Sequence, residues 1–246
     1  HAIYGTLFLG DRQVKKVDDW KGKDQLKQLY QSISVKLSKD ECLDLPPIIF
    51  KDVHFNRSKE YELIRKNRVL ELPNETIAYD NVMKLQHGLR FYANQTNKLA
   101  YTEMIAESTE ENIVIFYYYQ SEKESLIKSM KKLKKKIFEV SGNANILPER
   151  NEWDKLKNSV TLVQYQAGAA GIELQYANIV IFYTPTYSFQ DYDQALGRAY
   201  RNGQTKKVTV YRYITKRTIE ENIYAALSEK KDFTEELFKQ YIKEGK

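Results

Sequence analysis

The sequence predicts an α/β domain with a mostly parallel central sheet and helices on both of its faces. From about residue 98 onward, short apolar segments rich in β-branched and aromatic residues alternate with longer amphipathic segments. This alternation is typical of βαβ units, in which a crossover helix joins two parallel strands. The chain has 246 residues, of which 42% are hydrophobic and 29% charged, so one or two domains with a sizeable core are expected.

The first 80 residues have a less regular pattern. We expect residues 1–80 to form a mostly helical linker or protrusion segment ahead of the main domain at 81–246. Pro46 and Pro47 disfavour a helix around them and favour extended chain. The expected elements of this part are helices at 24–37, 58–66 and 77–92 and extended segments at 45–50 and 53–55.

In the main domain the two periodicities are easier to separate. Within the basic run 128–136, Met130 and Leu133 continue an apolar stripe at helical spacing, so the lysines are expected to cover the outer face of an amphipathic helix. The expected helices are 98–107, 122–135, 151–157, 188–201 and one that begins near 218, and the expected strands are 113–119, 137–140, 160–165, 179–183 and 208–214.

Two candidate motifs follow neighbouring strands of this predicted sheet. The turn Gly168–Gly171 comes after the strand at 160–165, and Thr184–Ser188 comes after the strand at 179–183. The carboxyl ends of parallel strands share one edge, and ligands of such sheets bind beyond that edge. We therefore expect both motifs at the same edge of the sheet.

The helix expected at 188–201 carries the most informative polar stripe of the chain. Ser188 followed by Asp191 resembles a capping box, and the Asn-Gly pair after the helix is a stop signal. Gln194, Arg198 and Arg201 are spaced i, i+4 and i+7, so they share one helix face. Two guanidinium groups on one face suit a phosphate. The alternative is a solvated helix with two surface arginines.

The turn at 167–171 (Ala-Gly-Ala-Ala-Gly) is the second candidate. Its glycines permit positive φ and a close approach of the backbone, and the exposed N–H groups would bind phosphate oxygens. The alternative is a tight turn selected for steric reasons alone. The presence of the arginine stripe downstream favours the functional interpretation.

At this point the residues carry a resemblance to a known family. Residues 194–205 contain Q-x-x-G-R-x-x-R followed by N-G-Q-T, a pattern similar to motif VI of superfamily two helicases. The run 165–174 resembles motif V, and 112–120 resembles motif IV. The segment 208–221 narrows the resemblance to the Swi/Snf-like branch of DNA translocases. The resemblance covers about residues 80–230, and residues 36–47 are loosely similar to the segment that links the two lobes.

The resemblance implies a RecA-like three-layer domain that is the C-terminal lobe of a longer motor. The chain lacks a G-x-x-x-x-G-K-[ST] loop, and the Asp40-Glu41 pair is assigned to the linker. ATP and Mg²⁺ would therefore be bound mainly by the N-terminal RecA-like lobe of the same parent chain. Because the sequence begins at His1 rather than Met, we expect a fragment that is inactive alone.

The match to motif VI assigns the site residues. Arg201 is the expected arginine finger, and Arg198 is a second phosphate contact or a link between the two lobes. Gln194 would orient one of these arginines or the attacking water. Two residues depart from the family pattern: Glu173 replaces the usual Asn, and Leu37 replaces the second arginine of the linking segment. The remaining expected contacts are Gly168 and Gly171 for the nucleotide, and Tyr119, Gln120, Gln166, Ala167 and Gly168 for nucleic acid.

The charge and composition of the chain limit the partners that it is expected to bind. A net charge of +6 and a pI of about 9.0 favour a polyanion, and the resemblance makes double-stranded DNA the expected one. No segment approaches the length of a membrane span, and the single cysteine suits a reducing, cytoplasmic location. Three histidines without close spacing predict no metal site. The compact linker suits a bacterial or phage protein. The alternatives are a lobe of a restriction translocase or RNA helicase, and a non-catalytic nucleic-acid-binding scaffold.

Overall fold

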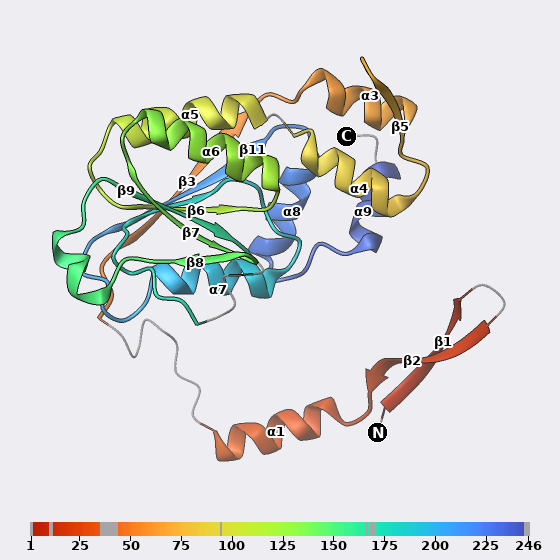
Figure 1. Cartoon of the computed structure of the whole chain (residues 1–246). Helices are drawn as coiled ribbons and strands as arrows, with labels where there is room; N and C mark the ends of the chain where they lie inside the picture. The colour runs from red at the N-terminus through yellow and green to blue at the C-terminus, as the bar shows by residue number, and fades with distance from the viewer. Residues whose placement is uncertain are drawn as a thin grey trace. The chain divides into compact units, whose positions relative to one another are not determined.

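The computed structural model describes residues 2–9, 12–34, 44–93, 95–165, 167 and 171–243 (Figure 1). The chain divides into two compact units, and the division falls between Asp44 and Leu45. The structure thus separates the units well before the expected position at residue 80. The reason is a long-range contact, because the strand that follows Pro47 belongs to the sheet of the second unit.

The first unit contains a hairpin and a helix. Strands β1 (Ala2–Leu9) and β2 (Arg12–Trp20) pair in antiparallel fashion, and α1 (Lys23–Ile33) follows Gly22, whose φ is 81°. The helix agrees with the expected one at 24–37, whereas the hairpin was not expected. Helix α1 bears an exposed apolar stripe of Leu26, Leu29, Tyr30 and Ile33.

The second unit is built on a seven-stranded sheet. Six neighbouring strands are parallel, and the last strand at one edge is antiparallel, so the expected mostly parallel sheet is confirmed. In spatial order the strands are β3 (Ile48–Phe55), β11 (Val208–Thr215), β10 (Ile179–Phe182), β6 (Ile113–Tyr117), β9 (Ser159–Gln164), β7 (Lys136–Ser141) and β8 (Ala144–Ile146).

Helices cover both faces of this sheet, which gives the expected three layers (Figure 1). On one face α5 (Gln95–Glu107) and α6 (Gln120–Lys132) pack on Ile113 and Ile115. On the other face α7 (Phe189–Ala199) and α8 (Ile219–Ser228) pack on Val114 and Phe116. The strand β6 alternates its side chains between the two cores because successive residues point to opposite faces.

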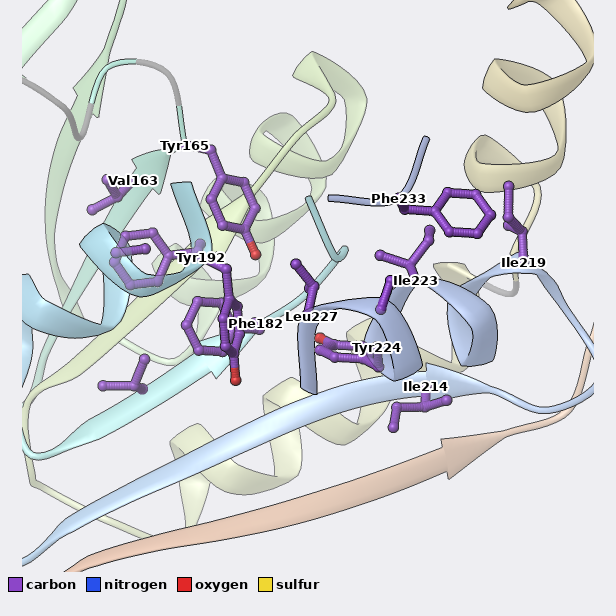
Figure 2. Close-up of a cluster of buried hydrophobic side chains, with 14 of the residues drawn as sticks. Val163, Tyr165, Phe182, Tyr192, Ile214, Ile219, Ile223, Tyr224, Leu227 and Phe233 are labelled. Atoms are coloured by element: carbon purple, nitrogen blue, oxygen red, sulfur yellow. The ribbon is translucent and has the colours of Figure 1, made fainter. Parts of the chain in front are cut away.

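Figure 2 shows the core under α7 and α8. Tyr192 of α7 and Tyr224 and Leu227 of α8 surround Phe182 of β10. The rings of Phe182 and Tyr192 lie 4.7 Å apart between centroids. This packing fixes α7, the helix that carries the candidate arginines, against the middle of the sheet.

Several smaller elements complete the second unit. The helix expected at 77–92 begins only at residue 82, because residues 75–78 form the second strand of a hairpin. Asn81 caps that helix by accepting a hydrogen bond of 2.9 Å from the backbone N–H of Lys84. These elements are α3 (Lys59–Asn67), β4 (Val69–Leu72), β5 (Glu75–Ala78), α4 (Val82–Phe91) and α9 (Glu235–Lys243).

The other expected elements of the second unit are present with small shifts of their ends. The segment expected as a helix at 151–157 is a 3-10 helix, η1 (Arg150–Lys155). In α6, Met130 is buried while Lys128, Lys131 and Lys132 are exposed, which confirms the amphipathic interpretation of the basic run. Within the described ranges, no helix combines the length and apolarity needed to cross a membrane.

Candidate functional site

The three motif segments leave the sheet at its carboxyl edge. Strands β6, β9 and β10 are parallel neighbours, and Phe116 aligns with both Val163 and Phe182. The expected common edge is therefore confirmed for Tyr165, Ala167 and Thr184–Ser188. Gln166 and Gly168 lie outside the described residues. Gly171 has a φ of 69°, the left-handed conformation for which a glycine was expected.

A buried carboxylate organises the segment that resembles motif IV. Both backbone N–H groups of Tyr118 and Tyr119 donate to Oε2 of Glu122 at 3.0 Å, and the Thr184 hydroxyl donates to Oε1 at 2.5 Å. Burial raises the pKa of the Glu122 carboxyl above its ordinary value. Since Thr184 follows β10 and Tyr118 follows β6, one side chain joins two loops of this edge. The sequence analysis did not single out Glu122.

The two nucleic-acid contacts expected after β6 differ in accessibility. Tyr119 is 7% exposed, and burial raises the pKa of its hydroxyl to about 12. Gln120 is exposed at the start of α6, where its amide lies 3.3 Å from Glu124. The structure therefore gives Tyr119 a packing role and leaves Gln120 as the residue of this pair that faces solvent.

Helix α7 carries the arginines away from the edge at which it begins. The Ser188 hydroxyl accepts a hydrogen bond from the backbone N–H of Asp191 at 3.2 Å, which confirms the expected cap. Because α7 connects the parallel neighbours β10 and β11, it must run back toward their amino ends. Arg198 consequently lies nearly three turns along α7 from its beginning, and only the beginning of α7 shares the carboxyl edge.

The helix ends earlier than expected, at Ala199. Tyr200 has φ −102° and ψ 83°, so Gln194 and Arg198 share a helix face while Arg201 lies in the turn beyond it. Arg201 is a half-buried residue, and its guanidinium forms no hydrogen bond or ion pair with another described residue. A guanidinium in that state retains its capacity to bind an anion.

Gln204 explains why the helix stops there. Its side-chain amide donates to the carbonyl of Ala199 at 3.3 Å and to that of Ala177 at 2.9 Å, and it accepts from the backbone N–H of Lys206 at 2.9 Å. Its backbone N–H also donates to the Arg201 carbonyl at 3.0 Å. This buried amide thus closes the turn that presents Arg201.

The motif V segment meets the arginines through its second half. Residues 171–177 run from the carboxyl edge back toward the start of β10, beside α7. The backbone N–H of Leu174 donates to the carbonyl of Arg198 at 3.0 Å. The structure therefore brings motifs V and VI together at the end of α7. The chain's departure from the family, Glu173, forms an ion pair of 3.0 Å with Arg150 of η1.

A second charged pair lies near the carboxyl edge and was not anticipated. Lys98 of α5 and Glu220 of α8 form an ion pair of 2.5 Å, with side chains that are 1% and 0% exposed. The other oxygen of Glu220 accepts from the backbone N–H of Thr215 at 2.8 Å. A lysine and a glutamate separated by more than a hundred residues give no local sequence signal. In the described part of the chain, no group of three or more His, Cys, Asp and Glu side chains could hold a metal ion.

Comparisons with known proteins agree with the resemblance that the motifs carry. Residues 96–203 match the family described as helicase conserved C-terminal domain. The chromatin-remodeling ATPase INO80 of Schizosaccharomyces pombe is 33% identical over 65% of this chain and 10% of that protein. The human INO80 protein is 48% identical over 30% of the chain and 5% of that protein. The ATP-dependent helicase fft3 of S. pombe is 27% identical over 75% of the chain and 21% of that protein.

Among solved structures, the C-terminal part of the Fun30 ATPase domain has the same fold. Its TM-score is 0.61 at 17% identity, over 81% of this chain and 96% of that one. Together, the fold, the ordered motifs and these similarities support a C-terminal RecA-like lobe of the Swi/Snf-like branch of superfamily two. The relatives named above are eukaryotic and give no support to a bacterial or phage source.

Proposed function

We propose that this chain is the second lobe of a DNA-dependent ATPase and translocase of the chromatin-remodelling kind. The N-terminal lobe of the same parent chain would hold most of the ATP and its Mg²⁺. This lobe would close over the nucleotide and supply arginines to it. The chain spans only a small part of its curated relatives, 10% in the first case and 21% in another, so the activity is a property of the intact parent.

The observation that carries this proposal is the state of Arg201. This half-buried residue lies on a turn that Gln204 closes, and its guanidinium forms no ion pair with another described residue. Such a group would stabilise the negative charge that develops on the γ-phosphate during transfer. Arg198, one turn earlier on α7, would make the second phosphate contact, and Gln194 on the same face would orient it or the attacking water.

The carboxyl edge would provide the nucleic-acid contacts. Gln120 is exposed at the N-terminus of α6, where backbone N–H groups and the helix dipole favour a phosphate. Gln166, Ala167 and Gly168 would contact the backbone in the same manner, and Gly171 would let the turn approach closely. Contacts of this kind are independent of sequence and weaken with salt.

The test is ATP hydrolysis by the intact parent protein with and without double-stranded DNA. Arg201→Ala should lower the turnover by about 10³-fold or more, since arginine fingers contribute on that scale. Arg201→Lys keeps a charge and loses the planar fork, so it should recover little. Lys207→Ala, which removes an exposed cation six residues later, is the matched control and should retain the activity.

Each alternative has its own outcome. Hydrolysis stimulated by RNA and not by DNA would identify an RNA-directed motor. Activity indifferent to both nucleic acid and Arg201 would identify a scaffold that keeps the fold. Full activity of Arg201→Ala would refute the finger assignment.

A further inference from the structure

Arg90, on helix α4, is a buried cation that the motifs do not account for. It is only 2% exposed, and among the described residues it forms no ion pair. One of its nitrogens, Nη1, has no hydrogen-bond partner there. Burying a charge without a carboxylate is costly, so its surroundings must compensate in another way.

Aromatic rings provide that compensation. The guanidinium carbon lies 3.6 Å from the ring centroid of Tyr118 and 4.0 Å from that of Tyr187. Its Nε donates to the Tyr119 hydroxyl at 3.2 Å, and that hydroxyl donates to the His87 carbonyl at 3.3 Å. Cation–π contacts strengthen when the pair is shielded from water. Although burial opposes the charge, Tyr187 and Tyr119 raise the pKa of Arg90 above its ordinary value.

These tyrosines belong to different loops of the carboxyl edge. Tyr118 and Tyr119 directly precede Gln120 in the motif IV loop. Tyr187 directly precedes Ser188, the cap of the motif VI helix, and its hydroxyl donates to the Gln86 carbonyl of α4 at 3.2 Å. Arg90 therefore contacts both the motif IV loop and the loop that leads into α7. It lies on α4, which belongs to neither loop.

The charge of Arg90 also has an electrostatic effect on the first residue of the motif V segment. Tyr165, the first residue after β9, is buried, and burial raises the pKa of its hydroxyl well above the ordinary value. The charge of Arg90 acts on that hydroxyl in the opposite direction. The direct contacts of Arg90 are with the end of the motif IV segment and with the residue before the cap of α7.

We propose that Arg90 is a positioning residue that couples nucleic-acid binding at the motif IV loop to the motif VI helix. The proposal rests on the proposed function, because it concerns how that ATPase is stimulated. A planar guanidinium stacks on two rings and donates in its plane, which fixes the relative orientation of the loops. A lysine would keep the charge but could not hold both rings in one geometry.

The experiment compares the intact parent protein with Arg90→Lys, in the presence and absence of double-stranded DNA. We expect the DNA-stimulated turnover to fall about tenfold, as for loss of stacked and hydrogen-bonded contacts in a shielded site. The turnover without DNA and the KM for ATP should stay within about twofold, because Arg90 does not touch the nucleotide face of α7. Arg65→Lys is the matched control, since Arg65 also stacks on a tyrosine, 5.4 Å from the Tyr241 ring, on other elements.

A milder variant guards against misfolding. Tyr119→Phe keeps the ring and removes only the hydroxyl that Arg90 contacts, so it should lower DNA stimulation by a smaller factor. Its effect should be absent in the Arg90→Lys background, because the two side chains act as one unit. Thermal denaturation of each variant measures stability separately.

The outcomes separate the two proposals. A wild-type protein without DNA stimulation overturns the proposed function and this inference with it. A stimulated wild type together with a fully stimulated Arg90→Lys variant overturns only the inference. An equal fall of basal and stimulated turnover, matched by lost thermal stability, also overturns it, because it shows that Arg90 serves only to fold α4.

Discussion

The carboxyl edge of the sheet and the end of α7 both contain charged side chains, but they use them differently. At the edge, Glu122 accepts three hydrogen bonds, and Lys98 pairs with Glu220 in a contact that is almost fully buried. At the end of α7, Arg201 is half-buried and its guanidinium has no partner among the described residues. The charges of Glu122, Lys98 and Glu220 are satisfied within the fold, whereas that of Arg201 is available to a ligand.

This difference separates two roles of a charged side chain in this fold. A buried ion pair holds two elements together, and removal of one partner leaves the other charge uncompensated in a medium of low polarity. A half-buried unmatched arginine contributes little to the fold and can be removed with small effect on stability. Substitutions at the carboxyl edge should therefore mainly lower stability, whereas substitution of Arg201 should mainly lower activity.

The largest effect on stability is expected at Lys98. Lys98→Met should lower the free energy of unfolding by about 3–5 kcal/mol, because it leaves Glu220 buried without its counter-ion. By contrast, Arg201→Ala should change it by about 0.5 kcal/mol or less, although we expect it to lower ATP turnover by about 10³-fold. Urea denaturation of the intact protein, followed by circular dichroism, measures both.

The control for this experiment removes both charges. Lys98→Met with Glu220→Gln should regain much of the loss, since the glutamine still accepts the hydrogen bond that Thr215 donates. If the double variant were as unstable as the single one, the loss would come from packing of the Lys98 stem, and the contrast between the two regions would disappear.

An intermediate effect is expected at Gln204, which lies between the two cases. Gln204→Ala should lower the free energy of unfolding by about 1–3 kcal/mol, because the carbonyls of the buried residues Ala177 and Ala199 lose their hydrogen-bond donor. It should also lower DNA-stimulated hydrolysis, since the turn that presents Arg201 loses its brace. Hydrolysis and urea denaturation would be measured on the same preparation.

Thr205→Ala provides the comparison for that variant, because the neighbouring threonine is exposed. It should leave both quantities unchanged. A Gln204→Ala variant that lost stability but kept full hydrolysis would show that Arg201 is positioned without the help of this turn.

The sequence predicted most of what depends on local pattern. Alternating apolar and amphipathic segments located β6, β9, β10 and β11 and the helices between them, and the Ser188 cap located α7. The place of β3 could not be found in this way, because it pairs along its whole length with β11, from Ile48–Val208 to Phe55–Thr215. A partner some 160 residues away leaves no trace in a local window.

The candidate site also contains residues that local sequence pattern reveals and residues that only long-range contacts reveal. The arginines could be singled out because motif VI is contiguous in the sequence, and their roles stay a prediction. Lys98, Glu220 and Arg90 were missed, since their meaning lies in contacts between elements that are distant in sequence. The place at which motifs V and VI meet was also missed. It depends on the direction in which α7 crosses from β10 to β11, and that brings Leu174 beside Arg198.

The smallest effect is expected where the chain departs from its family. Glu173 is 33% exposed and its partner Arg150 71%, so water and salt screen their ion pair. Glu173→Asn, which introduces the residue usual in the family, should lower the free energy of unfolding by about 0.2–1 kcal/mol at low salt. Urea denaturation at low and at high salt measures the difference between the variant and the wild type.

Exchanging the residues at positions 150 and 173 tests whether their interaction is electrostatic. Arg150→Glu with Glu173→Arg should regain most of the loss at low salt, and all variants should converge at high salt, where screening removes the attraction. A loss that persisted at high salt would mean that Glu173 acts through its shape. In that case its contact with η1 would belong with the matched charges of the carboxyl edge, whose effect on stability does not depend on screening by solvent.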